Sequence, residues 1–370
     1  MSLFGIYVHH PWCKKRCAYC SFNVYVEINP PFQQWKEHVL KDWRIEQNYF
    51  SNRASSVYFG GGTPSLAPPE TIGDLLQAFA PAESAEITLE LNPGDICIEQ
   101  LNMLKAYGVN RFSVGIQSFI RRYARLLNRS HTIEDNHHIL KQLKHSTPKS
   151  WSLDLIFGLP DQTLNELIWD VDQALRHEPP HISLYGLTIE EGTPLQKSVL
   201  SGKIKVLDED RWAEQFNYLM ERLEREGYSQ YEISNFARPG HRSVHNEHIW
   251  KGGFYAGLGP GAHGLRPCGT RTLQHSSWSK WIESDQPKYE PSTPYQRVCD
   301  HILTRTRHIN GLPLQLIKEH GYEIDPLTIR ELQGANWVQC IANHLVLTRL
   351  GRSFSDFITL KLIQNTHSLD

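Results

Sequence analysis

Short apolar runs alternate along the chain with segments in which apolar residues recur every three or four positions. The segment 71–80 places its apolar residues on one helical face, and the segment 98–108 does the same before Gly108, a typical helix terminator. Six apolar runs indicate buried strands, at Phe4–Val8, Val57–Phe59, Ile87–Leu91, Phe112–Ile116, Ser152–Phe157 and Ile182–Leu187. Such alternation predicts an α/β fold with a parallel sheet, here an incomplete (β/α)6 barrel of the TIM type.

The pattern changes towards the end of the chain. Residues 1–235 carry the strand–helix repeats, and residues 236–294 form a Gly-rich connecting segment. Residues 295–370 predict short helices followed by a strand, as in a small α+β domain of the winged-helix type. Because residues 300–370 carry seven Lys or Arg and seven Asp or Glu, this domain lacks the basic surface of a DNA-binding module. We expect it to act as a lid or a packing domain.

Distinctive motifs stand at one place in each strand–helix unit. Three cysteines follow the first strand, "GGGTP" follows the second, and "ELNP", "GIQS", "DLIFGLP" and "YGLT" end the remaining four. In parallel α/β folds the carboxyl ends of the strands form the active-site face. The motifs therefore predict one functional site on this rim of the barrel.

Composition and charge restrict the class of protein. The 370 residues are 40% hydrophobic, and 38 Lys and Arg balance 40 Asp and Glu, so nothing in the charge argues for a nucleic-acid partner. Four of the seven cysteines are scattered singly, which fits a reducing compartment. The first strand-like run begins at Leu3, leaving no room for a signal peptide, and no transmembrane segment is expected. We expect a soluble cytoplasmic protein.

Cys13, Cys17 and Cys20 are spaced C-x3-C-x2-C, and thiolates bind zinc or iron–sulfur clusters. Zinc would need a fourth ligand, which His9 or His10 could provide, but there is no second well-separated ligand pair. Three cysteines in one short loop also suit three corners of an iron–sulfur cubane, with one iron left open. The spacing alone leaves both alternatives open.

Four polar residues on the same rim are candidate ligand contacts. Glu90 and Asp154 stand among apolar neighbours, where a carboxylate needs hydrogen-bond donors, and a ribose diol offers two. Gln117 could bind hydroxyl groups, and Arg129 could bind a carboxylate with its planar guanidinium. The structural alternative for the two carboxylates is loop capping or pairing with an Arg. For Gln117 it is an ordinary backbone hydrogen bond, and for Arg129 it is a solvated surface position.

The segments "YVHHPWCKKRCAYCSF", "FGGGTPS", "ELNPG", "GVNRFSVGIQSF", "LNRSH" and "DLIFGLP" together resemble the radical S-adenosylmethionine (SAM) superfamily, and within it the oxygen-independent coproporphyrinogen oxidase group. The resemblance covers nearly the whole chain, including a C-terminal domain of the type found in that group. It implies a [4Fe-4S] cluster on the three cysteines, with SAM on the open iron. The SAM contacts that it implies are Tyr7, Tyr19, Gly61, Gly62, Thr63, Glu90, Gln117, Arg129, Asp154 and Thr188.

Within that group, two features resemble the HemW-type haem chaperones more than the oxidases. The oxidases carry a fourth cysteine where this chain has Phe22, although Phe22 taken alone could also be a core aromatic. They also have a longer arm before the first strand. The resemblance to the chaperones implies that haem is bound and passed to acceptor haemoproteins, respiratory ones being suggested. A coproporphyrinogen III oxidase is the alternative, and we assign no catalytic residue.

The segment "HNEHIW" is similar to a haem-associated H-N-x-x-Y-W motif of the chaperones. His245 and Trp250 match it, and Ile249 departs from it at the tyrosine position. An imidazole is a suitable axial ligand and an indole can cover a porphyrin face. His245 and Trp250 are therefore the predicted haem contacts, with His248 and His263 as nearby alternative ligands.

Overall fold

Six parallel strands form the centre of the molecule. The computed structural model describes residues 3–369. The strands are β1 (Phe4–His10), β4 (Ser56–Gly61), β5 (Glu86–Leu91), β6 (Arg111–Gln117), β7 (Ser150–Phe157) and β8 (His181–Gly186). Each pairs in parallel with the next in chain order. The expected strands are all present, and β1 continues beyond the expected end because His9 and His10 pair with Gly60 and Gly61.

The sheet curls but does not close into a full barrel. At one edge, β8 pairs with the antiparallel strand β10 (Asn235–Ala237), which pairs with β9 (Ser229–Gln230). At the other edge, β1 pairs in parallel with β11 (Phe254–Leu258), followed by β12 (His263–Leu265), β13 (Thr270–Leu273) and β14 (Lys288–Pro291). The Gly-rich segment thus extends the central sheet. The incomplete barrel of the α/β class is confirmed.

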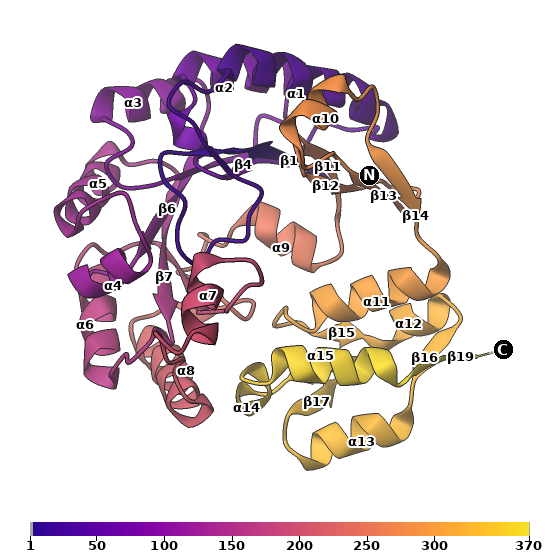
Figure 1. Ribbon diagram of the computed structural model, residues 1–370. Helices are drawn as coiled ribbons and strands as arrows, with labels where there is room; N and C mark the ends of the chain where they lie inside the picture. The colour runs from indigo at the N-terminus through magenta and orange to yellow at the C-terminus, as the bar shows by residue number, and fades with distance from the viewer. Residues whose placement is uncertain (1–2, 370) are drawn as a thin grey trace.

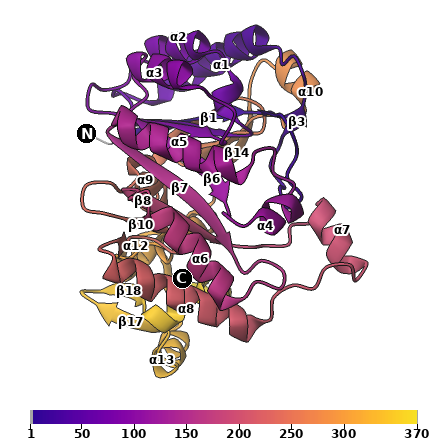
Figure 2. The same cartoon turned by 90° about the vertical axis from the view of Figure 1, so that its left-hand side faces the viewer.

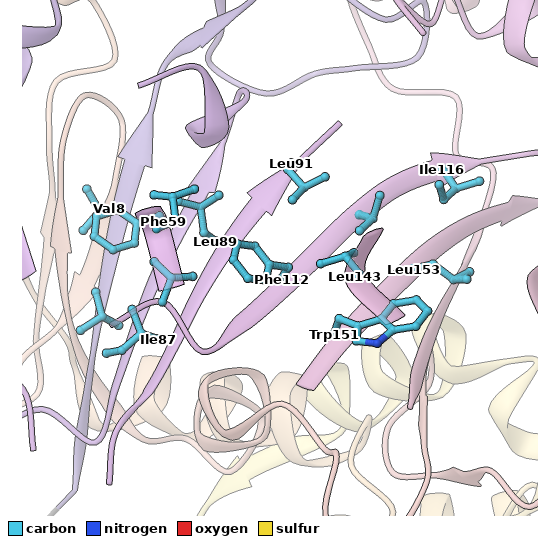
Figure 3. Close-up of a cluster of buried hydrophobic side chains, with 14 of the residues drawn as sticks. Val8, Phe59, Ile87, Leu89, Leu91, Phe112, Ile116, Leu143, Trp151 and Leu153 are labelled. Carbon is cyan, nitrogen blue, oxygen red and sulfur yellow. The ribbon is translucent and has the colours of Figure 1, made fainter. Parts of the chain in front are cut away.

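Helices cover the outer face of the sheet (Figure 1). They are α1 (Phe32–Glu46), α2 (Pro69–Phe79), α3 (Ile98–Ala106), α5 (Ile133–Ser146), α6 (Leu164–Leu175) and α8 (Glu209–Arg225). The short helices α4 (Arg121–Leu126) and α7 (Pro194–Leu200) lie to the right of the sheet in Figure 2. The side chains of Thr132 and Thr163 cap α5 and α6, as their positions at the start of helical segments suggest. Figure 3 shows how Leu143 of α5 lies among strand residues such as Phe112 and Leu153. No described helix is both long and apolar enough to cross a bilayer.

A second, smaller unit lies below the barrel in Figures 1 and 2. Its helices are α11 (Pro294–Arg305), α12 (Leu314–Glu319), α13 (Pro326–Gly334), α14 (Arg349–Arg352) and α15 (Ser355–Gln364). Its strands are β15 (Leu312–Pro313), β16 (Tyr322–Ile324), β17 (Val338–Ile341), β18 (His344–Leu347) and β19 (Thr366–Ser368). It has its own apolar core, in which Val298, Ile302 and Ile358 are fully buried. This agrees with the expected α+β architecture of the C-terminal region.

Candidate cluster and cofactor site

The three cysteines lie in the loop between β1 and α1. Two short strands, β2 (Trp12–Cys13) and β3 (Tyr25–Val26), pair at the base of this loop. Cys17 and Cys20 lie further along it, where the Cys20 N–H donates to the Cys17 carbonyl at 3.3 Å. Cys13, Cys17 and Cys20 are partly buried and are not joined by disulfides. All three line the same cavity at the carboxyl ends of the strands.

The cavity has a volume of about 400 Å³, within the range of small-molecule sites. Of the predicted cofactor contacts, all but Tyr7 line it: Tyr19, Gly61, Gly62, Thr63, Glu90, Gln117, Arg129, Asp154 and Thr188. The Tyr7 hydroxyl instead donates to His9 Nδ1 at 3.1 Å, and its ring stacks on Tyr58. The structure therefore brings together residues that come from all six barrel strands or the loops after them.

The glycine motif is packed against the cysteine loop. The Gly62 N–H donates to the His10 carbonyl at 2.7 Å, and the Thr63 N–H donates to the Trp12 carbonyl at 2.8 Å. A Cβ atom on Gly62 would lie 2.5 Å from the Trp12 carbonyl oxygen. The absence of a side chain at Gly62 therefore lets the cysteine loop approach the backbone of the motif. These contacts fix the start of the cysteine loop, next to Cys13.

Glu90 stands at the end of β5 with its carboxylate held in place. It accepts hydrogen bonds from the Tyr58 hydroxyl at 2.8 Å and from the Gly61 N–H at 3.1 Å. Burial raises the pKa of Glu90 to about 7, and these two donors act in the opposite direction. The oriented carboxyl can accept hydrogen bonds from ligand hydroxyl groups when it is ionised.

Asp154, near the end of β7, has a similar environment. The Ser113 hydroxyl lies 3.4 Å from both carboxylate oxygens. Burial raises the pKa of Asp154 to about 6, while the hydroxyls of Ser183 and Ser113 lower it. Two partly buried carboxyl groups therefore face one cavity from neighbouring parts of the sheet.

Gln117 enters the cavity from an irregular end of β6. The register between β6 and β7 shifts at Gly115 and Gln117, as in a β-bulge. Gln117 has a φ of +69°, in the left-handed region that side chains other than glycine rarely adopt. Its Oε1 atom is buried and has no hydrogen-bond partner in the described chain. An unpartnered amide oxygen on a strained backbone indicates a position shaped for a ligand.

Arg129 lies beside the cysteines. Its Nη1 atom donates to the Cys17 thiol at 3.0 Å, and its Nη2 atom donates to the Gly115 carbonyl at 2.7 Å. Its Nε atom is buried and has no partner among the described residues. A guanidinium next to thiols favours their thiolate form, which is the form that binds metals.

Burial raises the pKa of the Cys13 and Cys20 thiols, so it favours their protonated form in the absence of metal. Burial raises the pKa of Cys13 to about 11, a hydrogen bond from Thr63 opposes the shift, and Cys17 and Cys20 add to it. The Thr63 hydroxyl lies 3.5 Å from the Cys13 sulfur. Metal binding would therefore release protons from this loop.

His9 and His10, the alternative zinc ligands, do not line the cavity. The Nε2 atom of His9 donates to the Asn23 carbonyl at 2.9 Å. His10 is fully buried and packs against the rings of Trp12, Phe32 and Trp35. In residues 3–369 no three His, Cys, Asp or Glu side chains gather around a single ion position. The three thiols, two unpartnered polar groups and the glycine cradle fit a multinuclear cluster with a bound cofactor better than one zinc ion.

Several residues of the site were missed by the sequence interpretation. Asn92 donates from Nδ2 to the Thr63 hydroxyl at 2.8 Å and accepts a hydrogen bond from Arg129, so it joins the glycine motif to the arginine. Ser113 and Tyr185 also line the cavity. The motif "ELNP" contained the signal for Asn92, but nothing singled out Ser113. Phe22 is 61% exposed at the cavity, so its interpretation as a core aromatic is wrong.

The structure does not bring the predicted haem contacts to this cavity. His245 lies on α9 (Val244–Trp250), is buried, and its Nδ1 atom is 2.9 Å from the hydroxyl of Ser56. Ser56 begins β4, whereas the cavity lies at the end of that strand. Figure 2 shows α9 on the left and α4 and α7 on the right of the sheet. Burial lowers the pKa of His245 to about 3, so it is neutral.

Trp250 and His248, on the same helix as His245, also contact other parts of the protein. The Trp250 ring carries the guanidinium of Arg307 at 4.9 Å from its centroid. His248 donates from Nε2 to the Phe254 carbonyl at 2.9 Å, while His263 is exposed on β12. The segment is thus packed between the amino-terminal ends of the strands and the C-terminal unit.

Comparison with known proteins adds family information to this geometry. The family model described as "Radical SAM superfamily" matches residues 7–174. The protein "Heme chaperone HemW" of Escherichia coli is 34% identical over 325 residues, covering 84% of both chains. The Haemophilus influenzae protein of the same name is 33% identical, covering 85% of both chains.

Two further matches bear on length and fold. "Radical S-adenosyl methionine domain-containing protein 1, mitochondrial" of Danio rerio is 37% identical over 295 residues, which cover 76% of this chain and 66% of the relative. The solved structure described as "Coproporphyrinogen III oxidase (HemN) from Escherichia coli is a Radical SAM enzyme" superposes with a TM-score of 0.81. It covers 98% of this chain and 90% of its own at 20% identity, and at that identity the likeness shows the fold alone.

Proposed function

Because the chain belongs to the HemW family of the radical SAM superfamily, we propose that it binds haem and transfers it to acceptor haemoproteins. The observation that carries the proposal is the cavity itself. Three thiols face it, and Phe22 stands at its edge where the oxidase resemblance would require a fourth cysteine. On this proposal the protein acts in the cytoplasm, and respiratory haemoproteins are the suggested acceptors.

Cys13, Cys17 and Cys20 would hold a [4Fe-4S] cluster, each thiolate binding one iron. SAM would occupy the remaining iron. When bound, the cluster and the cofactor supply one-electron redox chemistry that no side chain of the protein can provide. Arg129 would hold the cysteine loop in place through its 3.0 Å contact with the Cys17 sulfur, and Asn92 holds Arg129 against the glycine motif.

The remaining cavity residues would bind the organic part of SAM. Glu90 and Asp154 provide carboxylates for ribose hydroxyl groups, and Gln117 provides an amide with an unused acceptor. The Gly61–Thr63 segment would face the methionyl amine, and Arg129 would pair with the methionyl carboxylate. Tyr19 and Thr188 lie at the edge of the same cavity. Tyr7 would act through His9 and Tyr58, because its side chain does not reach the cavity.

His245 and Trp250 stay the predicted haem contacts. The imidazole of His245 is neutral, as an axial ligand requires, and it is buried against Ser56. Haem ligation by His245 would therefore require α9 to move away from the ends of β1 and β4. Trp250 is partly exposed at the end of the same helix.

Anaerobic reconstitution with iron and sulfide, followed by haem titration, tests the proposal. The haem-loaded protein is then mixed with an apo-haemoprotein, and the visible spectrum reports transfer. A parallel sample receives coproporphyrinogen III and a reductant. We expect about four irons per chain, haem transfer and no protoporphyrinogen. Stoichiometric protoporphyrinogen would establish the oxidase alternative, and a colourless protein with one zinc per chain would contradict both.

A further inference from the structure

Helix α11 presents a row of basic side chains outside the cysteine cavity. Arg297, His301 and Arg305 occur four residues apart, so they lie on one face of the helix. The ring of His320, which follows α12, stacks on that of His301 with centroids 5.3 Å apart. All four side chains are partly buried. They form a basic cluster, defined here as Arg297, His301, Arg305 and His320.

Two glycine-containing turns pack against this basic cluster. A Cβ atom at Gly252, just after α9, would lie 3.2 Å from His301 Nδ1 and 3.8 Å from Arg305 Nε. A Cβ atom at Gly269, in the turn between β12 and β13, would lie 3.5 Å from Arg297. The side chains of the basic cluster therefore extend from α11 towards two glycine-containing turns, one just before β11 and one between β12 and β13.

Three buried nitrogen atoms of the basic cluster lack a partner in the described chain. Arg297 Nε, Arg305 Nε and His301 Nδ1 are buried without a hydrogen-bond partner in residues 3–369. Neither arginine forms an ion pair with a described carboxylate. By contrast, Arg271 pairs with Asp300 on the neighbouring side of α11, and Arg307 pairs with acidic groups just beyond it.

The electrostatics around His301 point the same way. Its pKa is lowered to about 4, first by burial and then by Arg305, His320 and Arg297, with no acidic neighbour acting in the opposite direction. Burial also lowers the pKa of Arg305. His301 is therefore uncharged at neutral pH, and Arg297 and Arg305 are the cations of the cluster that lack a partner among the described residues. A partly buried cation without a partner is costly, and an anion bound to these guanidinium groups would reduce that cost.

We infer that the basic cluster on α11 binds an oxyanion, a carboxylate or a phosphate, through the guanidinium groups of Arg297 and Arg305. Planar guanidinium groups recognise both anions with paired hydrogen bonds. The turn at Gly252 directly follows α9, which carries Trp250, so the cluster borders the predicted haem contacts. This position favours the carboxylates of haem as the anion, an assignment that rests on the proposed function. Free phosphate is the alternative source of the same chemistry.

The first arm of the test uses inorganic phosphate alone and does not involve haem. Thermal unfolding of the cluster-reconstituted full chain is measured in phosphate and in chloride at equal ionic strength. We expect phosphate to raise the Tm of the wild type by about 2 °C or more and to leave the double variant Arg297→Gln/Arg305→Gln unaffected. Lys318→Gln, which removes an exposed charge from the same unit, should behave like the wild type. Equal shifts in the wild type and the double variant would overturn the inference.

The second arm compares haem with haem dimethyl ester, in which both carboxylates are blocked. We expect esterification to weaken binding to the wild type about tenfold, or about 1.4 kcal/mol, and to have no effect on the double variant. If the double variant folds poorly, Arg305→Lys replaces it, because lysine keeps the charge but loses the planar group. The effect of esterification on Arg305→Lys should be smaller than on the wild type but not zero. Equal affinities for both haems would overturn the haem assignment and leave phosphate as the source. No haem binding to any variant would refute the proposed function while the first arm still decides the site.

Discussion

Gln117 adopts a left-handed backbone conformation at the point where β6 reaches the cavity. A φ of +69° in a residue with a side chain costs about 1–2 kcal/mol, and the surrounding bulge maintains it. The strain turns the amide into the cavity, where its oxygen has no partner in the described chain. The sequence indicated Gln117 as a ligand contact from its motif, but the bulge depends on pairing with β7, which a local pattern cannot reveal.

Gln117→Gly tests whether this strain serves binding. Glycine removes the backbone strain, so we expect the free energy of unfolding to rise by up to about 1 kcal/mol. SAM affinity should fall about tenfold because the amide is lost. Urea unfolding and anaerobic calorimetry measure the two effects. Thr147→Gly, at a φ of 46° on the exposed end of α5, is the matched control and should change stability without changing SAM binding. Unchanged affinity in Gln117→Gly would contradict this account.

Gly62→Ala tests the packing of the glycine motif on the cysteine loop. The added Cβ would lie 2.5 Å from the Trp12 carbonyl oxygen, so the loop must move and the three thiols lose their arrangement. We expect the reconstituted variant to hold less than half of the wild-type iron and sulfide while its circular dichroism is unchanged. Gly334→Ala, where the added atom meets nothing within 4 Å, should retain the full iron content. Full iron content in Gly62→Ala would show that the loop tolerates the displacement.

At the scale of elements, the loop after β6 is held by helix α6. Asp170 of α6 accepts hydrogen bonds from the Ser118 hydroxyl at 2.8 Å and the Phe119 N–H at 2.6 Å. These contacts fix the chain immediately after Gln117. The sequence predicted β6 from its apolar run, but Asp170 is an acidic residue within a helix, where such a residue usually faces solvent. Its buried role follows from the crossover geometry, which places α6 against the adjacent loop.

Asp170 makes the stability of the protein depend on pH. Burial raises its pKa to about 7 in the folded state, above the value of about 3.9 expected in the unfolded chain. The folded state therefore binds more protons, and this contribution to stability is lost as the pH rises from about 4 to about 7. In Asp170→Asn the loss of stability between pH 5 and pH 8 should shrink by about 2 kcal/mol. Chemical unfolding at the two pH values measures it, and an unchanged difference would refute the assignment.

At the scale of the whole molecule, the sheet separates the cysteine cavity from the predicted haem contacts on α9. The cysteine cavity lies at the carboxyl ends of the strands, and α9 with His245 lies where β4 begins. The C-terminal unit is joined to α9 through His308, whose Nε2 atom is 3.3 Å from the Glu247 carboxylate. The position of each strand followed from its apolar run. The sheet extension by β11–β14 did not, because short Gly-rich strands have little periodicity.

The sequence could not show how the cysteine cavity and the predicted haem contacts lie relative to each other. The motifs after the six strands share an edge by the rule of parallel sheets, so the cavity could be predicted. The segment of His245 follows the last strand–helix unit and is positioned by long-range contacts, such as those with Ser56 and Glu86. No spacing in the sequence encodes such contacts.

The electron paramagnetic resonance spectrum of the reduced protein, recorded with and without SAM, tests the central claim most directly. The claim is that Cys13, Cys17 and Cys20 hold a [4Fe-4S] cluster whose open iron binds SAM. The account predicts a cluster signal that changes when SAM is added, and no signal in a folded Cys17→Ser protein. A wild-type signal that does not respond to SAM, or a cluster retained in Cys17→Ser, would contradict it.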